Sequence, residues 1–197
     1  MPSNSPEMAE DFSHLSIPTA RLLLRPLREG DADAVLAIRS DPEVMRYHSS
    51  GPWTSIEPAR ALIARDVAAM ACGESLRLGL TVIENGADAA LIGSCCLFHL
   101  DHANRRTEIG YELHRSAWGR GYMHEALQAL LAFAFSNMGL NRVEADIHPD
   151  NVASARTAER LGFLREGLLR ERWIVEGDVS DTAMYGLLRR DWLARKQ

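Results

Sequence analysis

Hydrophobic and polar positions follow different periods in successive segments of the chain, and each period predicts an element. The run at 19–27 has strand character, and the apolar positions after it share one face of a helix. Asp31 can cap that helix, which should end before Pro42. Thr54 and Glu57 have the spacing of a capping box at the start of a second amphipathic helix. Two helices are therefore expected before the main sheet.

The remaining segments predict strands, then a helix between strands. Strand-like runs with their separating turns are expected at 76–83, Asn85-Gly86, 90–100, 101–104 and 106–113, which suits an antiparallel meander. A helical period follows the sequence WGRGY and ends near Gly139, and a strand at 141–148 comes next, so the sheet should be locally parallel there. A helix at 151–161 and two strands, at 163–168 and 181–188 on either side of Gly177-Asp178, complete the pattern. The expected fold class is α/β (α+β), with a mixed, mostly antiparallel sheet flanked by helices.

Composition agrees with one folded domain. The 197 residues are 46% hydrophobic and 25% charged, which is enough for one sizeable core. Residues 1–16 are polar and lack periodicity, so they are expected to form a loose tail, and the domain is expected to span 17–197. No run of eighteen apolar residues suggests a membrane span, and no secretory signal is apparent.

Cysteine content and charge narrow the setting and the partners. Cys72, Cys95 and Cys96 have no disulfide or zinc spacing, so a reducing, cytoplasmic setting is expected. The seven histidines lack a pattern such as H-E-x-x-H, so no metal is expected. A net charge of -5 argues against nucleic acid and is compatible with a cationic substrate.

The segment between the strand at 106–113 and the next helix carries the strongest chemical signal. Gly119 and Gly121 lie in a loop that enters a helix, where backbone N–H groups can converge on a phosphate. A tight turn without a ligand explains a lone G-x-G equally well. A dinucleotide motif would need a third glycine at position 124, which is His124, and the Gly-Lys-Ser/Thr of a P-loop is absent.

The motifs together resemble the GNAT acetyltransferases, in the branch that contains the ribosomal-protein N-terminal acetyltransferases. The resemblance spans roughly Ile17 to Trp192, and its matching stretches are TARLLLRPLREGD, SDPEVMRY, EIGYEL, WGRGYMHEAL, HPDNVASARTAERLGFLREG and DTAMYGLL. It implies the GNAT fold, with acetyl-CoA bound at the strand-loop-helix turn, CoA as product and no metal.

The resemblance assigns the cofactor site residue by residue. The family signature Q/R-x-x-G-x-G/A falls on 116–121; both glycines match and Ser116 departs. Backbone N–H groups would come from Trp118, Gly119, Arg120, Gly121, Tyr122 and Met123. In the family the preceding strand bulges, and an N–H near Leu113 polarises the thioester carbonyl.

The resemblance also points to the helix that begins near Asn151. It places the Asn151 amide beside the acetyl-pantetheine and Ser154 near the sulfur. Since the stretch around them offers no tyrosine, Ser154, or a water that it orients, would protonate the leaving thiolate. The alternative is that Asp150 or Asn151 caps the helix and that Ser154 is an ordinary polar residue of its first turn.

For the general base, Glu108 and Glu112 should lie on one face of a regular strand. Glu108 is the first candidate and Glu112 the second, with surface placement as the alternative for both. Direct attack without an acyl-enzyme is expected, because Cys95 and Cys96 look like core residues rather than nucleophiles.

The amine acceptor is expected to be the N-terminal α-amine of a protein or peptide. An α-amine is roughly one-tenth neutral at pH 7, whereas lysine must lose roughly 4.6 kcal/mol of protonation first. Tyr47, Trp53 and Glu108 are candidate acceptor contacts, and Trp53 could instead pack at the start of the second helix. The alternatives are a small-molecule amine (polyamine, amino acid or aminoglycoside), a noncatalytic acyl-CoA-binding or sensing module, and a structural domain. The protein is expected to be a monomer or a homodimer.

Overall fold

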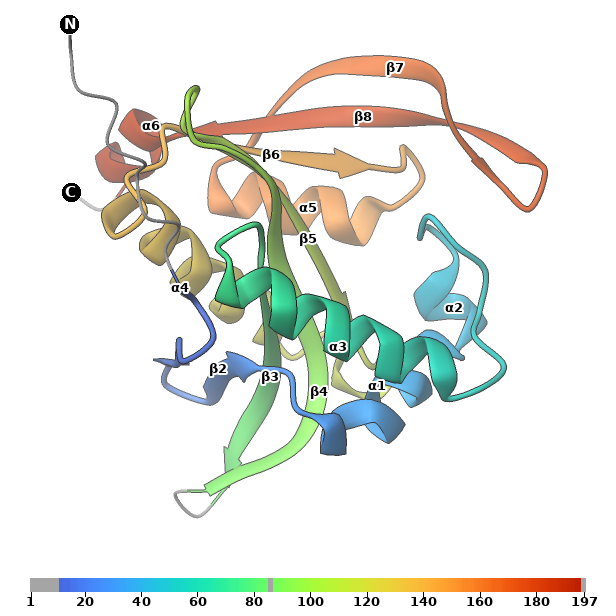
Figure 1. Cartoon of the computed structure of the whole chain (residues 1–197). Coiled ribbons are helices and arrows are strands. Elements are labelled where there is room, and N and C mark those ends of the chain that lie inside the picture. The colour runs from blue at the N-terminus through green and yellow to red at the C-terminus, as the bar shows by residue number, and fades with distance from the viewer. Residues whose placement is uncertain (1–10, 85–86, 196–197) are drawn as a thin grey trace, which may run out of the picture.

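The computed structural model describes residues 11–84 and 87–195, and in this part of the chain an eight-stranded sheet carries helices on both faces (Figure 1). The strands are β1 (Ile17–Pro18), β2 (Leu22–Pro26), β3 (Leu76–Glu84), β4 (Ala87–Asp101), β5 (Arg106–Leu113), β6 (Arg142–Ile147), β7 (Leu164–Val175) and β8 (Asp178–Leu188). The helices are α1 (Ala32–Arg39), α2 (Pro42–Met45), α3 (Glu57–Ala71), α4 (Tyr122–Ser136), α5 (Val152–Leu161) and α6 (Arg189–Ala194). Two 3-10 turns, η1 (Glu29–Asp31) and η2 (Arg115–Ala117), precede α1 and α4.

The sheet has the predicted mixed topology. Its order is β1-β2-β3-β4-β5-β6-β8-β7, and among the described strands β5 and β6 form the parallel pair while the other neighbours are antiparallel. Helix α4 connects the two parallel strands, as the strand-helix-strand pattern predicted. No helix of the described residues is long and apolar enough to cross a membrane.

The two faces of the sheet are covered by different layers. Alternate residues of β3, including Leu76, Leu78 and Leu80, are fully buried in the main core together with α4 and α5. The other face packs against α1 and α3 through a smaller apolar cluster. Asp66 of α3 and Glu112 of β5 are buried polar residues. The α1/α3 face of the sheet is thus partly polar, and this matters for the site.

The packed region begins before Ile17. Phe12, which was expected to belong to a loose tail, is 2% exposed in the main core and meets Phe133 edge to face at 6.3 Å. Its backbone N–H donates to the Met70 carbonyl at 3.0 Å. Leu15 also packs, partly buried, against the same core, so the segment 11–16 contacts the core at two apolar side chains. Residues 1–10 lie outside the described part of the chain.

Two predicted helix caps differ from the structure. Helix α3 begins at Glu57 with Ile56 at its N-cap and no side-chain cap bond, so the Thr54 capping box is wrong. Asp31 does stand at the N-cap of α1, but its carboxylate accepts from Arg25 and from the Arg28 N–H instead. A charge partner from β2 therefore outcompetes the local cap.

The C-terminal strands are longer than the sequence predicts. β7 and β8 run to Val175 and from Asp178, because their hairpin extends beyond the rest of the sheet (Figure 1). At the hairpin turn, the Glu176 carboxylate fills the space beside Gly51 in the segment between α2 and α3. The predicted Asn85-Gly86 turn lies outside the described residues.

Candidate active site

The site begins where β5 and β6 separate. These strands pair only over Arg106–Glu108 and Arg142–Glu144, although β5 stays paired with β4 as far as Leu113. Beyond the paired part, β5 and β6 each present an edge with no strand beside it (Figure 1). Such an edge leaves backbone N–H and C=O groups available to a ligand.

Leu113 presents its backbone to this open edge. The next N–H, that of His114, donates to the Ile92 carbonyl on the β4 side at 2.8 Å. Because backbone groups of successive residues point to opposite edges of a strand, the N–H and C=O of Leu113 face away from β4. The Trp118 indole N–H donates to the Leu113 carbonyl at 2.7 Å from that side, which leaves the Leu113 N–H directed at the open edge.

The expected bulge is not what exposes this N–H. Pairing between β4 and β5 is continuous from Gly93 opposite Leu113 to Phe98 opposite Glu108. The irregularity lies further along, after Phe98, where His99 has a positive φ of 52°. Separation of β5 from β6 frees the N–H without a bulge on the β4 side.

The glycine loop, residues 118–123, has the conformation that the sequence predicted. Gly119 and Gly121 have φ of 73° and 79°, a region that other residues rarely adopt. Gly121 is the N-cap of α4 and supplies no side-chain cap, so the first N–H groups of the helix, from Tyr122 and Met123, remain for a ligand. A Cβ on Gly119 would meet nothing within 4 Å, so the loop has an open approach. These features fit a diphosphate.

Arg21 binds the glycine loop, a role that the sequence analysis did not predict. Its guanidinium donates to the Arg120 carbonyl at 3.0 Å and pairs with Glu125 on α4 at 2.6 Å. It also lies over the Tyr122 ring at 4.7 Å. Thr19 donates to the same glutamate at 2.6 Å. The start of the sheet therefore fixes the glycine loop and the first turn of α4 together.

Ser116, the residue that departs from the family signature, contacts a neighbour in its own turn. The Ser116 hydroxyl lies 2.8 Å from Nδ1 of His114, inside the turn η2. Arg115 pairs with Asp41 at 3.0 Å, which ties the loop to the segment before α2. Ser116 is therefore a turn residue here.

Ser154 meets a tyrosine from β5. Asn151 is the N-cap of α5, and its side-chain oxygen accepts from the Ser154 N–H at 3.1 Å. The Ser154 hydroxyl lies 2.7 Å from the Tyr111 hydroxyl. Burial raises the pKa of Tyr111, and the bond to Ser154 only partly opposes this effect. The site thus holds a protonated tyrosine. It comes from β5, so it is distant in sequence from residues 151–154, where a proton donor was expected.

Glu112 lies on the opposite face of β5 from Tyr111 and is 6% exposed. Its carboxylate accepts from Arg39 Nε at 2.9 and 3.1 Å and from the Ser94 hydroxyl at 3.0 Å. Burial acts to raise the pKa of Glu112, but the charges of Arg39, Arg77 and His48 outweigh it and hold this pKa below its usual value. Glu112 is therefore an ionised partner of Arg39 rather than a free proton acceptor.

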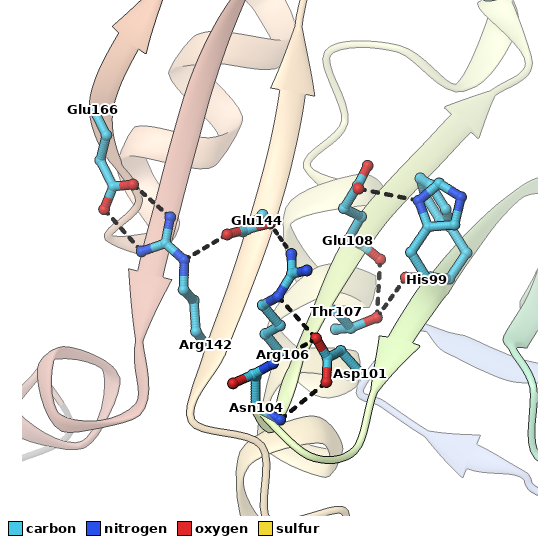
Figure 2. A network of polar contacts seen from close by, with 10 residues as sticks. His99, Asp101, Asn104, Arg106, Thr107, Glu108, Arg142, Glu144 and Glu166 are labelled. Atoms are coloured by element: carbon cyan, nitrogen blue, oxygen red, sulfur yellow. Dashed lines mark hydrogen bonds and ion pairs between the residues drawn. The ribbon is translucent and has the colours of Figure 1, made fainter.

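Glu108 lies in the paired part of the strands, away from these groups. It is four residues from Glu112, or roughly 13 Å along an extended strand, and it lies 3.0 Å from the His99 ring. Figure 2 shows it beside a row of ion pairs that crosses the sheet. The members of the row are Glu166, Arg142, Glu144, Arg106 and Asp101, and the Asn104 amide donates to Asp101 at its end. The structure does not bring Glu108 together with Leu113 or Ser154.

The two aromatic acceptor candidates are both near the site but do different things. The Tyr47 hydroxyl donates to the Asp150 carbonyl at 3.2 Å, and its ring lies 4.9 Å from that of His148, so it borders the start of α5. Trp53 packs on the α1/α3 cluster and lies beneath the Arg39 guanidinium at 4.8 Å. Tyr47 borders the α5 side of the site, and Trp53 supports the arginine that binds Glu112.

Comparison with known proteins identifies the fold and its chemistry. Residues 21–164 match the family model described as an acetyltransferase (GNAT) domain. A solved structure of a probable acetyltransferase superposes with a TM-score of 0.81 at 29% identity, covering 90% of this chain and 99% of that chain. The chain belongs to the GNAT acetyltransferase family.

Individual relatives agree on the class of enzyme. The N-acetyltransferase p20 of Bacillus licheniformis, whose activity is uncharacterised, is 37% identical over 174 residues, covering 88% of this chain and 96% of that protein. YdaF of Bacillus subtilis (strain 168), provisionally named a ribosomal N-acetyltransferase, is 38% identical over 118 residues, covering 57% of this chain and 64% of YdaF. The protein is an acetyl-CoA-dependent N-acetyltransferase. Within the described residues no group of three or more His, Cys, Asp or Glu side chains could hold a metal ion.

Proposed function

We propose that this enzyme transfers acetyl from acetyl-CoA to the N-terminal α-amine of a protein or peptide. The observation that carries the proposal is the ion pair between Glu112 and Arg39. Glu112 carries the carboxylate nearest the open end of β5, and this carboxylate already accepts from Arg39. Without a free carboxylate there, an acceptor that is already about one-tenth neutral at pH 7 suits the site better than a lysine side chain. The provisional name of YdaF, a ribosomal N-acetyltransferase, agrees with a protein acceptor.

The chain's own groups have complementary roles in this proposal. Acetyl-CoA, when bound, supplies an activated acetyl group as a thioester. The glycine loop would bind the diphosphate, and the Leu113 N–H, directed at the open edge, would donate to the carbonyl oxygen as it gains charge. Tyr111, in contact with Ser154, would donate the proton that the departing sulfur requires. Asn151 would hold Ser154 in place and could offer its amide N–H groups to the pantetheine arm.

A polyamine is the second candidate acceptor. The spermidine N(1)-acetyltransferase of Vibrio cholerae is 22% identical to this chain over 178 residues, covering 90% of this chain and 99% of that protein. The acidic net charge of -5 is compatible with such a cationic substrate.

Mass spectrometry of a mixed acceptor pool separates the two. The pool holds peptides that begin with Ala, Ser or Met, the same peptides with a blocked N-terminus and one internal lysine, spermidine, free amino acids and aminoglycosides. Acetylation of the free N-terminus, with the blocked peptides unchanged, is the expected result. Acetylation of spermidine or another small amine without peptide product would overturn the proposal.

A further inference from the structure

The loop after α2 places His48 against the buried carboxylate of Glu112. Its Nε2 lies 4.0 Å from Glu112 Oε2, and 26% of the histidine side chain is exposed against 4% of the glutamate side chain. The imidazole therefore covers the carboxylate and keeps part of its own surface toward solvent. Among the described residues, no hydrogen-bond partner contacts Nδ1 of this ring.

His48 and the residue before it contact both segments that border the open edge. The preceding residue, Tyr47, is bonded to the Asp150 carbonyl beside the start of α5. The carboxylate that His48 covers belongs to Glu112, which immediately precedes Leu113 on β5. Since Tyr111 and Glu112 point to opposite faces of the strand, His48 and the Tyr111–Ser154 pair lie on opposite sides of the Leu113 backbone. An acceptor on one side and a leaving sulfur on the other is the arrangement that direct transfer requires.

The charges around the imidazole suit proton transfer. Glu112 is fixed by Arg39 and Ser94, and Arg77 beside it donates to Ser94 at 3.3 Å and pairs with Asp66. Burial lowers the pKa of His48; Glu112 opposes this effect, and Arg39 and Arg77 add to it. The ring is therefore neutral at pH 7, and the anionic Glu112 can stabilise the imidazolium that forms when a proton arrives.

We propose that His48 accepts the proton of the incoming ammonium group, and that Glu112, held by Arg39, positions it. The assignment rests on the proposed transfer to an amine but not on which amine is used. One N–H bond of the ammonium breaks and its proton moves to the His48 ring. The freed lone pair then forms the C–N bond, the C–S bond breaks, and the second amine proton reaches the thiolate through Tyr111. His48 returns its proton to solvent, so ammonium and thioester give amide, thiol and one proton.

This proton acceptor is matched to a weakly basic amine. Proton transfer to His48, whose pKa lies below 6.5, is opposed by the difference in pKa between the amine and the histidine. This difference is smaller for an α-amine, with a pKa of about 8, than for lysine, near 10.4. The same residue thus gives a physical reason for the preference for α-amines.

The test compares His48→Gln with His102→Gln, an exposed histidine in the turn between β4 and β5. The acceptor is whichever amine the wild-type enzyme acetylates in the pool, so a polyamine result would end the peptide proposal and still allow this test. We measure kcat/KM from pH 5.5 to 9.5 and the acetyl-CoA Kd. At pH 7, His48→Gln should lower kcat about 10²-fold at unchanged Kd, and His102→Gln should match the wild type.

The pH profile gives the decisive readout. Wild-type activity should fall as pH drops through the pKa of His48, and His48→Gln should lack this limb. The variant's deficit should shrink above pH 8, where an α-amine is neutral in solution. A His48→Gln variant within twofold of the wild type at every pH would overturn the assignment.

An NMR titration tests the assignment in the wild-type protein, where misfolding of a variant plays no part. A Glu112→Gln variant tests the positioning role. An NMR titration of labelled histidines in the wild-type protein should give His48 a pKa equal to that of the kinetic limb, and disagreement would overturn the proposal. Glu112→Gln should move the limb to lower pH, because the anion that stabilises the imidazolium is lost. An unmoved limb in a folded Glu112→Gln protein would contradict the positioning role.

Discussion

Tyr111 illustrates how one hydroxyl can be decisive at the scale of a residue. It lies 2.7 Å from the Ser154 hydroxyl, in a buried environment that raises its pKa and keeps it protonated at neutral and mildly basic pH. A group in this state can donate a proton but cannot accept one. In the proposed mechanism, its position on β5, one residue from Glu112, puts the proton donor and the acceptor on opposite faces of the strand.

Tyr111→Phe should therefore lower kcat about 10²-fold and leave the acetyl-CoA Kd unchanged, since the ring and its packing remain. Steady-state kinetics and calorimetric titration measure the two quantities. Tyr185→Phe is the matched control, because the Tyr185 hydroxyl bonds Glu159 and not Ser154. Equal kcat in Tyr111→Phe and the wild type would remove the tyrosine from the mechanism.

Gly121 is the second residue whose local conformation has a functional consequence. Its φ of 79° disfavours a side chain by roughly 1–2 kcal/mol, and a branched one more. Gly121→Val should weaken acetyl-CoA binding at least tenfold, as measured by calorimetric titration. Gly139→Val introduces the same strain at φ 65° after α4, away from the site. That control should lose stability but keep its Kd, and a normal Kd in Gly121→Val would rule out the glycine loop as the binding site.

Among the elements, the turn between β1 and β2 is joined to α4 by a charged contact that stabilises the glycine loop. Arg21 and Thr19 both bind Glu125, one turn into the helix, and Arg21 also binds the Arg120 carbonyl. The contacts hold the first turn of α4 against the sheet. The pKa of Glu125 is lowered, since the bonds from Thr19 and Arg21 outweigh the burial that would raise it.

Arg21→Met should raise the acetyl-CoA KM roughly fivefold with little change in kcat, because the pair is partly exposed and worth about 1 kcal/mol. Arg21→Lys should restore only part of the affinity, since lysine cannot bond Glu125 and Arg120 in the same fork. Arg172→Met, at another arginine stacked on an aromatic ring, is the control. A loss in kcat alone would contradict a role in holding the loop.

At the scale of the whole molecule, one sheet supports two different layers. The α4/α5 face is almost wholly apolar, whereas the α1/α3 face includes the buried carboxylates of Asp66 and Glu112 and the partly buried Arg77. The α4/α5 face provides most of the apolar packing. The α1/α3 face carries the charged groups, which include Glu112 beside the open end of β5. Phe12 shows that the apolar layer extends into the segment before β1.

Phe12→Ala should lower the free energy of unfolding by about 3–5 kcal/mol, since it empties a buried site. Urea unfolding measures this loss. His14→Ala, an exposed neighbour, should change stability by less than about 0.5 kcal/mol. A change in Phe12→Ala as small as in His14→Ala would show that residues 11–16 contribute little to the fold.

Features that depend on neighbouring residues could be predicted from the amino-acid sequence. The order of the longer strands and helices, the glycine loop and the N-cap at Asn151 follow from periodicity, φ preference and capping, which act within a few residues. The short elements β1, α2 and α6 were not predicted, and helix α3 begins without the predicted cap. Asn151 does cap α5, the alternative role that the sequence allowed.

Contacts between side chains from distant segments could not be predicted and are known from the folded chain. Tyr111 and Ser154 are 43 residues apart, Arg39 and Glu112 are 73 apart, and Arg21 and Glu125 are 104 apart. Strand alternation placed Glu108 and Glu112 on one face but could not indicate that β5 leaves β6 between them. That separation puts Glu112 near the open edge and Glu108 in a surface network. Long-range pairing depends on how the whole sheet closes its core, and no local pattern in the sequence records it.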